Sequence, residues 1–168
     1  MLRRSLAGPS VGVLAMALMT LVLVACSGSS ASKHPAQGAS GDAGPIAVRN
    51  AVLVSGPEGS SSATLVATLV NGSASADALT GVQVADPAPT ATYLTGGSIA
   101  VPPNSPVGIG HAGQSYVNLY GFTPRSSQVV AVTLVFRDHG STTLNVKVVP
   151  PTGTYAGIAP SPTAAPAS

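Results

Sequence analysis

Side chains that could do chemistry are few in this sequence, and they do not gather at close spacing. The 168 residues include three histidines, five acidic residues and a single cysteine. His34, His111 and His139 are scattered, whereas the ligands of a zinc or copper site usually come at short, regular spacings. No serine lies in a nucleophile-elbow context and the acids suggest no carboxylate pair, so we expect a protein that is not an enzyme.

One stretch combines polar and aromatic side chains in an alternating pattern. In "HAGQSYVNLYGF", His111 to Phe122, apolar and polar residues alternate, which predicts a strand with one face in a core. Val117 and Leu119 are expected to face that core. The opposite side, with the residue that precedes the strand, forms a candidate interaction face: His111, Tyr116, Asn118 and Tyr120.

The single cysteine stands at the end of the only long apolar run. Arg3 and Arg4 precede the weakly polar to apolar segment Val11–Ala25, which is short for a membrane-spanning helix and typical of a secretory signal. The run ends in "LVAC", which resembles the lipobox of bacterial lipoproteins. The resemblance implies a signal peptide over residues 1–25, cleavage before Cys26, and a diacylglyceryl group on the Cys26 thiol.

Lipidation at Cys26 would fix where the protein resides. Each buried methylene contributes about 0.8 kcal/mol, so two or three acyl chains hold a protein on a membrane lastingly. We therefore expect a lipid-anchored protein on the extracytoplasmic face of the cell membrane, with membrane lipid as its first partner. The alternative is an uncleaved membrane anchor in which the cysteine is incidental.

The charge of the chain gives no support for binding nucleic acid. The net charge of +2 includes Arg3 and Arg4 of the expected signal peptide. From Cys26 onward five basic and five acidic residues remain, and the basic residues form no cluster. We therefore expect no nucleic-acid partner, because a basic patch is the usual signature of such binding.

Composition divides the remaining sequence into three parts. Residues 26–45 are rich in Ser, Ala and Gly and lack a hydrophobic period, which predicts a flexible linker behind the lipidated cysteine. Residues 150–168 are rich in Pro and Ala, which predicts a disordered tail. The folded domain is then expected over residues 46–149.

Strand signals recur through this domain, and no stretch shows a convincing helical period. "IAVRNAVLV" alternates through its apolar positions Ile46, Val48, Val52 and Val54. "RDHGS" indicates the turn of a hairpin, whereas residues 85–98 look irregular. About seven short strands predict an all-β fold, a single antiparallel β-sandwich, with a barrel as the runner-up.

The segment from Ala63 to Val149 resembles a known family. "ATLVATLVNGSASADALTGVQV" is similar to the opening of the periplasmic PCu(A)C copper chaperones. "VPPNSPVGIGHAGQSYVNLYGF" resembles their turn and ligand-bearing strand, and "VVAVTLVFRDHGSTTLNVKVV" resembles their closing hairpin. The chain is also similar to LpqE-type lipoproteins of actinobacteria, a divergent branch. The resemblance implies a cupredoxin- or immunoglobulin-like β-sandwich.

The resemblance also implies a copper site whose ligands this sequence does not supply. The family holds Cu(I) with His and Met, because imidazole and thioether are soft ligands. Matching the family's strand places Tyr116 where the family has His and Asn118 where it has Met, and the upstream "TATYL" offers neither. All methionines lie in the expected signal peptide: Met1, Met16 and Met19. We predict no metal site and no cofactor.

Two functions remain after these exclusions. The first is a non-catalytic binding or interaction module, a membrane-anchored envelope lipoprotein that presents its sandwich to an unknown envelope protein or small ligand. The alternative is a residual copper- or metal-handling chaperone or accessory protein. The first rests on the lipobox, the linker and the neutral domain, whereas the alternative rests only on the family resemblance.

Replacing the cysteine tests the anchor directly. Cys26→Ser removes the thiol that would carry the lipid, so we expect an unprocessed or misplaced protein without acyl groups. Membrane fractionation and intact mass measure both effects. Unchanged fractionation and mass in the variant would refute the lipoprotein assignment.

Overall fold

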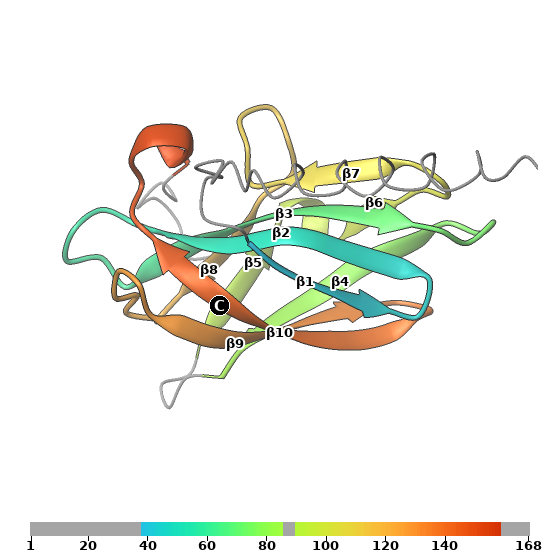
Figure 1. Ribbon diagram of the computed structural model, residues 1–168, viewed down its shortest axis with the longest axis horizontal. Helices are drawn as coiled ribbons and strands as arrows, with labels where there is room; N and C mark the ends of the chain where they lie inside the picture. Colours follow the sequence, from blue (N-terminus) through green and yellow to red (C-terminus); the bar gives the residue numbers. More distant parts are fainter. Residues whose placement is uncertain (1–37, 86–89, 159–168) are drawn as a thin grey trace, which may run out of the picture. The chain divides into compact units, whose positions relative to one another are not determined.

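The structure is a computed structural model that describes residues 38–85 and 90–158 (Figure 1). The expected signal peptide and Cys26 lie outside these residues. Within them, no helix is long and apolar enough to cross a membrane. The described chain is almost entirely β-structure, so the predicted all-β class is confirmed.

The described residues contain ten strands and two short 3₁₀ turns. The strands are β1 (Ala39–Ala43), β2 (Ile46–Ser55), β3 (Ser62–Asn71), β4 (Asp77–Val84), β5 (Ala91–Leu94), β6 (Ile99–Val101), β7 (Pro106–Ile109), β8 (Val117–Tyr120), β9 (Val129–Phe136) and β10 (Gly140–Val149). The turns are η1 (Thr95–Gly97) and η2 (Gly153–Tyr155).

The strands form one highly curved sheet rather than two separate ones. Its order is β5-β8-β3-β2-β10-β9-β4-β6, and β1 and β7 add to β2 and β3. The sheet almost closes on itself, since β5 at one end of this order approaches β4 near the other end. There the Thr92 hydroxyl in β5 donates to the Val82 carbonyl in β4 at 2.6 Å. The fold is therefore a barrel-like sandwich. One pairing departs from the predicted antiparallel arrangement, since β10 runs parallel to β2.

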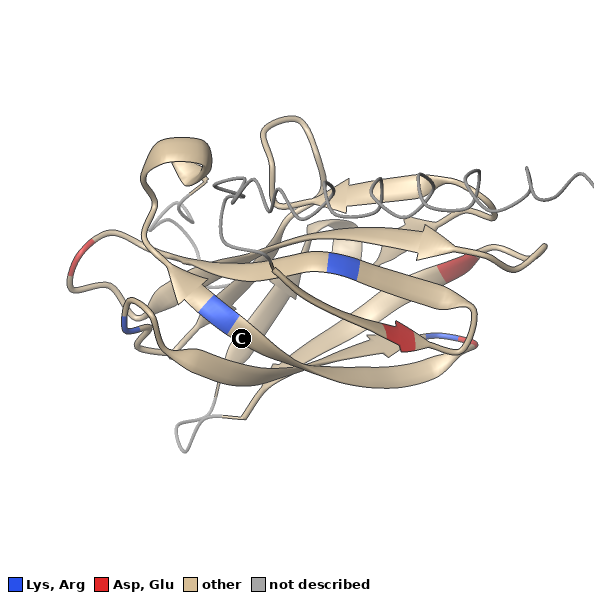
Figure 2. Ribbon diagram, viewed as in Figure 1, with Lys and Arg blue, Asp and Glu red and all other residues tan. Residues whose placement is uncertain are grey.

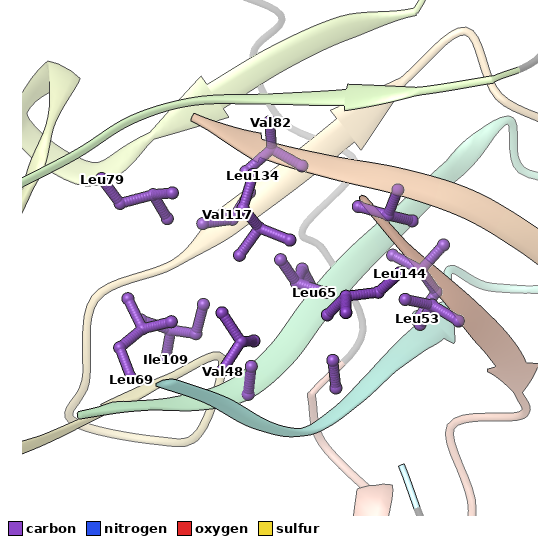
Figure 3. Close-up of a cluster of buried hydrophobic side chains, with 14 of the residues drawn as sticks. Val48, Leu53, Leu65, Leu69, Leu79, Val82, Ile109, Val117, Leu134 and Leu144 are labelled. Atoms are coloured by element: carbon purple, nitrogen blue, oxygen red, sulfur yellow. The ribbon is translucent and has the colours of Figure 1, made fainter. Parts of the chain in front are cut away.

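The core lies inside this curved sheet and follows from period-2 patterning. In β8, Val117 and Leu119 are buried as expected, and in β10 every second residue from Leu144 to Val148 is buried. Figure 3 shows Leu65, Val117 and Leu134 of three different strands turned toward one another.

A β-bulge changes the expected pattern in β2. The register against β3 shifts between Arg49 and Val52, and Asn50 takes a positive φ of 56°. An extra residue in a strand reverses which side later side chains face. Consequently Val48 and Leu53 lie in the core, whereas Val52 packs in a separate cluster on the other side of the sheet.

Both ends of the folded domain extend beyond residues 46–149. The linker prediction was wrong for Ala39–Ala43, which form β1 and pair with β2, tied by an ion pair of 2.9 Å between Asp42 and Arg49. The tail prediction was wrong for residues 150–158, because Ile158 is only 7% exposed and packs on the sheet. Composition missed β1 because its residues are small and polar although they pair with the adjacent strand β2, and it missed Ile158 because that residue contacts valines distant in sequence.

A buried carboxylate ties the start of β4 to the β9–β10 hairpin. The Asp77 side chain is fully buried, and its Oδ2 lies 2.7 Å from Nδ1 of His139. Oδ1 accepts from the backbone N–H groups of Ala78 and Asp138 at 2.6 and 3.1 Å. Burial alone would raise the pKa of Asp77, but the hydrogen bonds from His139 and the two N–H groups outweigh it and lower the pKa. His139 thus has a structural role beyond its hairpin turn.

Asp77→Asn tests this network. Since the folded pKa of Asp77 is lowered, its ionised form stabilises the fold above the unfolded pKa of about 3.9, and that stability is lost as the pH falls through the folded pKa. At neutral pH we expect a loss of about 2–3 kcal/mol in the free energy of unfolding. Urea denaturation of both proteins across the acid range measures it.

The matched control is Asp42→Asn, whose carboxylate forms an exposed ion pair and is expected to change stability by about 0.5 kcal/mol or less. Equal losses for the two variants, or an Asp77→Asn deficit that does not narrow in acid, would contradict the role given to Asp77.

Candidate functional site

The sheet side away from the main core, here called the outer face, crosses β2, β3, β8 and β5. Directly paired residues of adjacent strands point to the same side. The pairings Val54–Thr64, Thr64–Asn118 and Asn118–Tyr93 therefore set one row of side chains across four strands. In this row the candidate residue Asn118 lies between the buried hydroxyl of Thr64 and the exposed ring of Tyr93.

Three tyrosines surround Asn118 on the outer face. Tyr116 and Tyr120 lie two residues to either side of it, so both are diagonal neighbours of Tyr93 across the β5–β8 pair. Tyr93 is 43% exposed, and the other two are half-buried. We call this set the tyrosine face: Tyr93, Tyr116, Asn118 and Tyr120.

A hydrogen bond from the neighbouring strand β3 fixes the side chain of Asn118. The Thr64 hydroxyl donates to Oδ1 of Asn118 at 2.9 Å, and Thr64 itself is fully buried. A buried hydroxyl needs a partner, because leaving it unpaired costs free energy. The buried Thr64 hydroxyl therefore holds the Asn118 amide in one orientation, with Oδ1 toward β3.

Tyr116 is positioned by the turn that follows β5. Its backbone N–H donates to the Thr95 hydroxyl at 2.9 Å, and its carbonyl accepts from the Thr95 N–H at 3.0 Å. Thr95 thus extends the β5–β8 ladder by one side-chain bond. The chain then leaves through Gly96 and Gly97, whose positive φ angles suit glycine.

His111 lies in the loop between β7 and β8 rather than in the tyrosine row. The loop is held close to β3: a Cβ added at Gly110 would come within 2.5 Å of the Leu65 carbonyl oxygen and 2.8 Å of Val66. The loop is closed by the Gln114 N–H, which donates to the His111 carbonyl at 3.0 Å. His111 therefore stands beside the outer face, half-buried.

The C-terminal segment covers the other half of the outer face. Tyr155 and Ile158 pack on an apolar cluster of four valines: Val52, Val54, Val66 and Val149. In Figure 1 η2 and the loop between β7 and β8 project on the same side of β2 and β3. The outer face is therefore divided into a covered valine half and an uncovered tyrosine half.

The sequence identified three of the four residues of the tyrosine face and missed Tyr93. Residues 85–98 look irregular because prolines and glycines surround the four-residue strand β5. The only local signal was the tyrosine itself within "ATYL", and its place beside Asn118 follows from the register of β5 on β8. Thr64 was missed as well, since it lies in an apolar run.

Metal-ligating side chains do not gather in the part of the chain that the structure describes. Residues 38–85 and 90–158 contain no group of three or more His, Cys, Asp or Glu that could hold an ion. His139 is engaged with Asp77 at the far end of β4 from Val84. The tyrosine face offers phenol and amide groups, which suit hydrogen bonding and aromatic contact.

A hollow of about 440 Å³ opens elsewhere, where the loop after β2 meets the segments before β9 and after β10. Hydroxyls and prolines line it, among them Ser60, Thr123, Pro124 and Pro150. Glu58 is its only charged residue. It contains none of the candidate residues, and it is separate from the tyrosine face.

Comparison with known proteins identifies the architecture. No family model matches the chain, and no curated protein matches it. Among solved structures, the copper-bound PCuAC domain from PmoF2 is 28% identical with a TM-score of 0.58, covering 67% of this chain and 98% of that one. The chain has a PCuAC-like fold. The resemblance drawn from the sequence is thus confirmed at the level of the fold.

Two further solved structures agree with this PCuAC-like fold. The apo PmoF2 PCuAC domain is 26% identical, with a TM-score of 0.55 over 70% of this chain and 97% of that one. The apo PCuAC domain from PmoF1 is 20% identical, with a TM-score of 0.60 over 67% and 99%. The similarity to LpqE-type lipoproteins stays a prediction.

Proposed function

We propose that the protein is a non-catalytic envelope lipoprotein whose PCuAC-like domain presents the tyrosine face to a protein partner or small ligand. The observation that carries the proposal is the row Thr64–Asn118–Tyr93, flanked by Tyr116 and Tyr120. Exposed tyrosines offer large, stiff contact surfaces with a polar tip, and they are enriched in binding interfaces.

The chemistry of this face argues against copper as cargo. One solved relative is a copper-bound PCuAC domain. The resemblance read from the sequence implies that Tyr116 and Asn118 stand at the family's ligand positions. A neutral phenol and a carboxamide are poor ligands for Cu(I), which prefers thioether, thiolate and imidazole. Asn118 Oδ1 already accepts a hydrogen bond from Thr64. The residues present do not fit a His/Met copper site.

Anchoring through Cys26 would hold the domain close to the membrane. Since β1 begins at Ala39, only residues 27–38 separate the folded domain from the lipidated cysteine. A linker of about a dozen Ser- and Gly-rich residues has a mean span of about 20 Å. The proposed partner is therefore itself attached to the membrane, or reaches within about one domain diameter of it.

Site-specific cross-linking tests the interaction function. A photoreactive amino acid replacing Tyr93 should capture the same partner reproducibly in intact cells, because this side chain is the most exposed of the tyrosine face. The matched control replaces Ser141, an exposed residue of β10 away from the tyrosine face. Equal capture from both positions, or none from Tyr93, would count against the proposal.

The second candidate function, residual copper handling, is favoured by the likeness to the copper-bound PmoF2 domain. Titration of the processed domain with Cu(I) against a competing chelator decides between the two. We expect no binding tighter than about 1 μM. The positive control is Tyr116→His with Asn118→Met, which restores two soft ligands. Tight binding by the unchanged protein that His111→Ala abolishes would establish the copper function instead.

A further inference from the structure

The tyrosine face presents hydrogen-bond donors that the fold leaves unused. Asn118 Oδ1 accepts from Thr64, but Asn118 Nδ2 donates to none of the described residues. Since no buried side-chain nitrogen or oxygen in residues 38–85 and 90–158 lacks a partner, this Nδ2 is open to solvent. The bond to Thr64 fixes the amide, so its two free N–H groups are held ready for a ligand on the face.

Three phenol side chains surround this amide over an extended area. Tyr116 and Tyr120 lie four residues apart along the line of β8, which separates their Cα atoms by about 13 Å. Tyr93 pairs with Asn118 from the adjacent strand, about 5 Å away. The face is therefore longer than a single small ring, and it suits a ligand built as a chain of repeating units.

The strands that carry and adjoin this face bear no charge. β3, β5, β7 and β8 contain no Asp, Glu, Lys or Arg. Figure 2 shows charges on β1, β2, β4 and β10 and in loops, but none on these four strands. A charged ligand would lose hydration here without gaining a counter-charge, which costs free energy, whereas an uncharged ligand avoids that cost. The face therefore complements a neutral ligand.

An uncharged glycan has the surface that these groups complement. A sugar ring carries C–H bonds on its two faces and hydroxyl groups around its rim. The C–H bonds pack on aromatic rings, whose faces carry partial negative charge. The hydroxyl oxygens accept from amide N–H groups, and the hydroxyl hydrogens bond to phenol oxygens. Asn118 Nδ2 and the three tyrosines offer both kinds of partner on one side of the sheet.

We propose that the tyrosine face binds an uncharged chain of sugar units of the cell envelope. Sugar rings pack on Tyr93 and its tyrosine neighbours, and Asn118 Nδ2 donates to a sugar oxygen between them. Thr64 is a positioning residue, because its hydroxyl holds the Asn118 amide in place without touching the ligand. This assignment names the ligand class of the proposed interaction function and rests on that function.

Selective destruction of sugars or of proteins in the envelope tests the class of ligand. The chain from residue 26 onward, carrying Cys26→Ser, is mixed with washed envelope fragments of the producing cell, and the fraction that sediments with them is measured. One portion of the fragments is first digested with protease. Another is oxidised with periodate, which cleaves the carbon–carbon bond between neighbouring hydroxyl groups of sugars. We expect binding to survive protease and to be lost after periodate.

Substitutions at Tyr93 assign the binding to the tyrosine face. Tyr93→Ala removes the most exposed ring, so we expect about a tenfold loss of affinity for the protease-treated fragments. Tyr93→Phe keeps the packing surface, and its affinity should stay within about threefold of the unchanged protein. The matched control is Val129→Ala, because Val129 is 60% exposed on β9, outside the face, and its loss should leave binding unchanged. Urea denaturation shows that each variant is folded.

The outcomes separate the glycan assignment from the interaction function. Binding that protease abolishes and periodate leaves intact would overturn the glycan assignment, while the interaction function would stand with a protein partner. Equal losses for Tyr93→Ala and Val129→Ala would also overturn it, since binding would then not depend on the tyrosine face. No sedimentation with untreated fragments, together with no capture at Tyr93, would remove both the assignment and the function.

Discussion

Strand β3 is buried on both of its sides, so the rest of the domain must cover both sides and supply partners for its buried polar groups. Its inner side chains, such as Leu65, join the main core, while Thr64 and Val66 face outward and are equally buried. The valine is covered by the C-terminal segment and by the loop at Gly110. The threonine needs a polar partner, and Asn118 of β8 provides it. The candidate face is therefore a consequence of how the fold covers a central strand.

Much of the fold could be read from the sequence because local patterning dominates it. Strands β8 and β9 alternate throughout and β10 does so up to Val148, and their buried positions agree with this pattern. What could not be read depends on how the strands pair and pack. The bulge at Asn50 reverses the alternation of β2, and nothing in "IAVRNAVLV" marks it. β1 and Ile158 lie in polar or proline-rich stretches and become ordered only through β2 and its neighbours.

The candidate site was predicted in part for the same reason. Tyr116, Asn118 and Tyr120 share one strand, so their common side follows from period 2 alone. Tyr93 and Thr64 join them through two different interstrand registers, which a single sequence does not specify. The face offers rings and an amide, so specificity there would come from shape and hydrogen bonding.

The parallel pairing of β2 with β10 has a consequence for how the chain folds. β2 is joined to β10 at Val52–Lys147, so a strand near the start of the domain completes its pairing only with the last strand. Contacts between such distant residues slow folding, because the chain must close a long loop before the contact stabilises it. The sheet therefore cannot close until β10, late in the chain, is available to pair with β2.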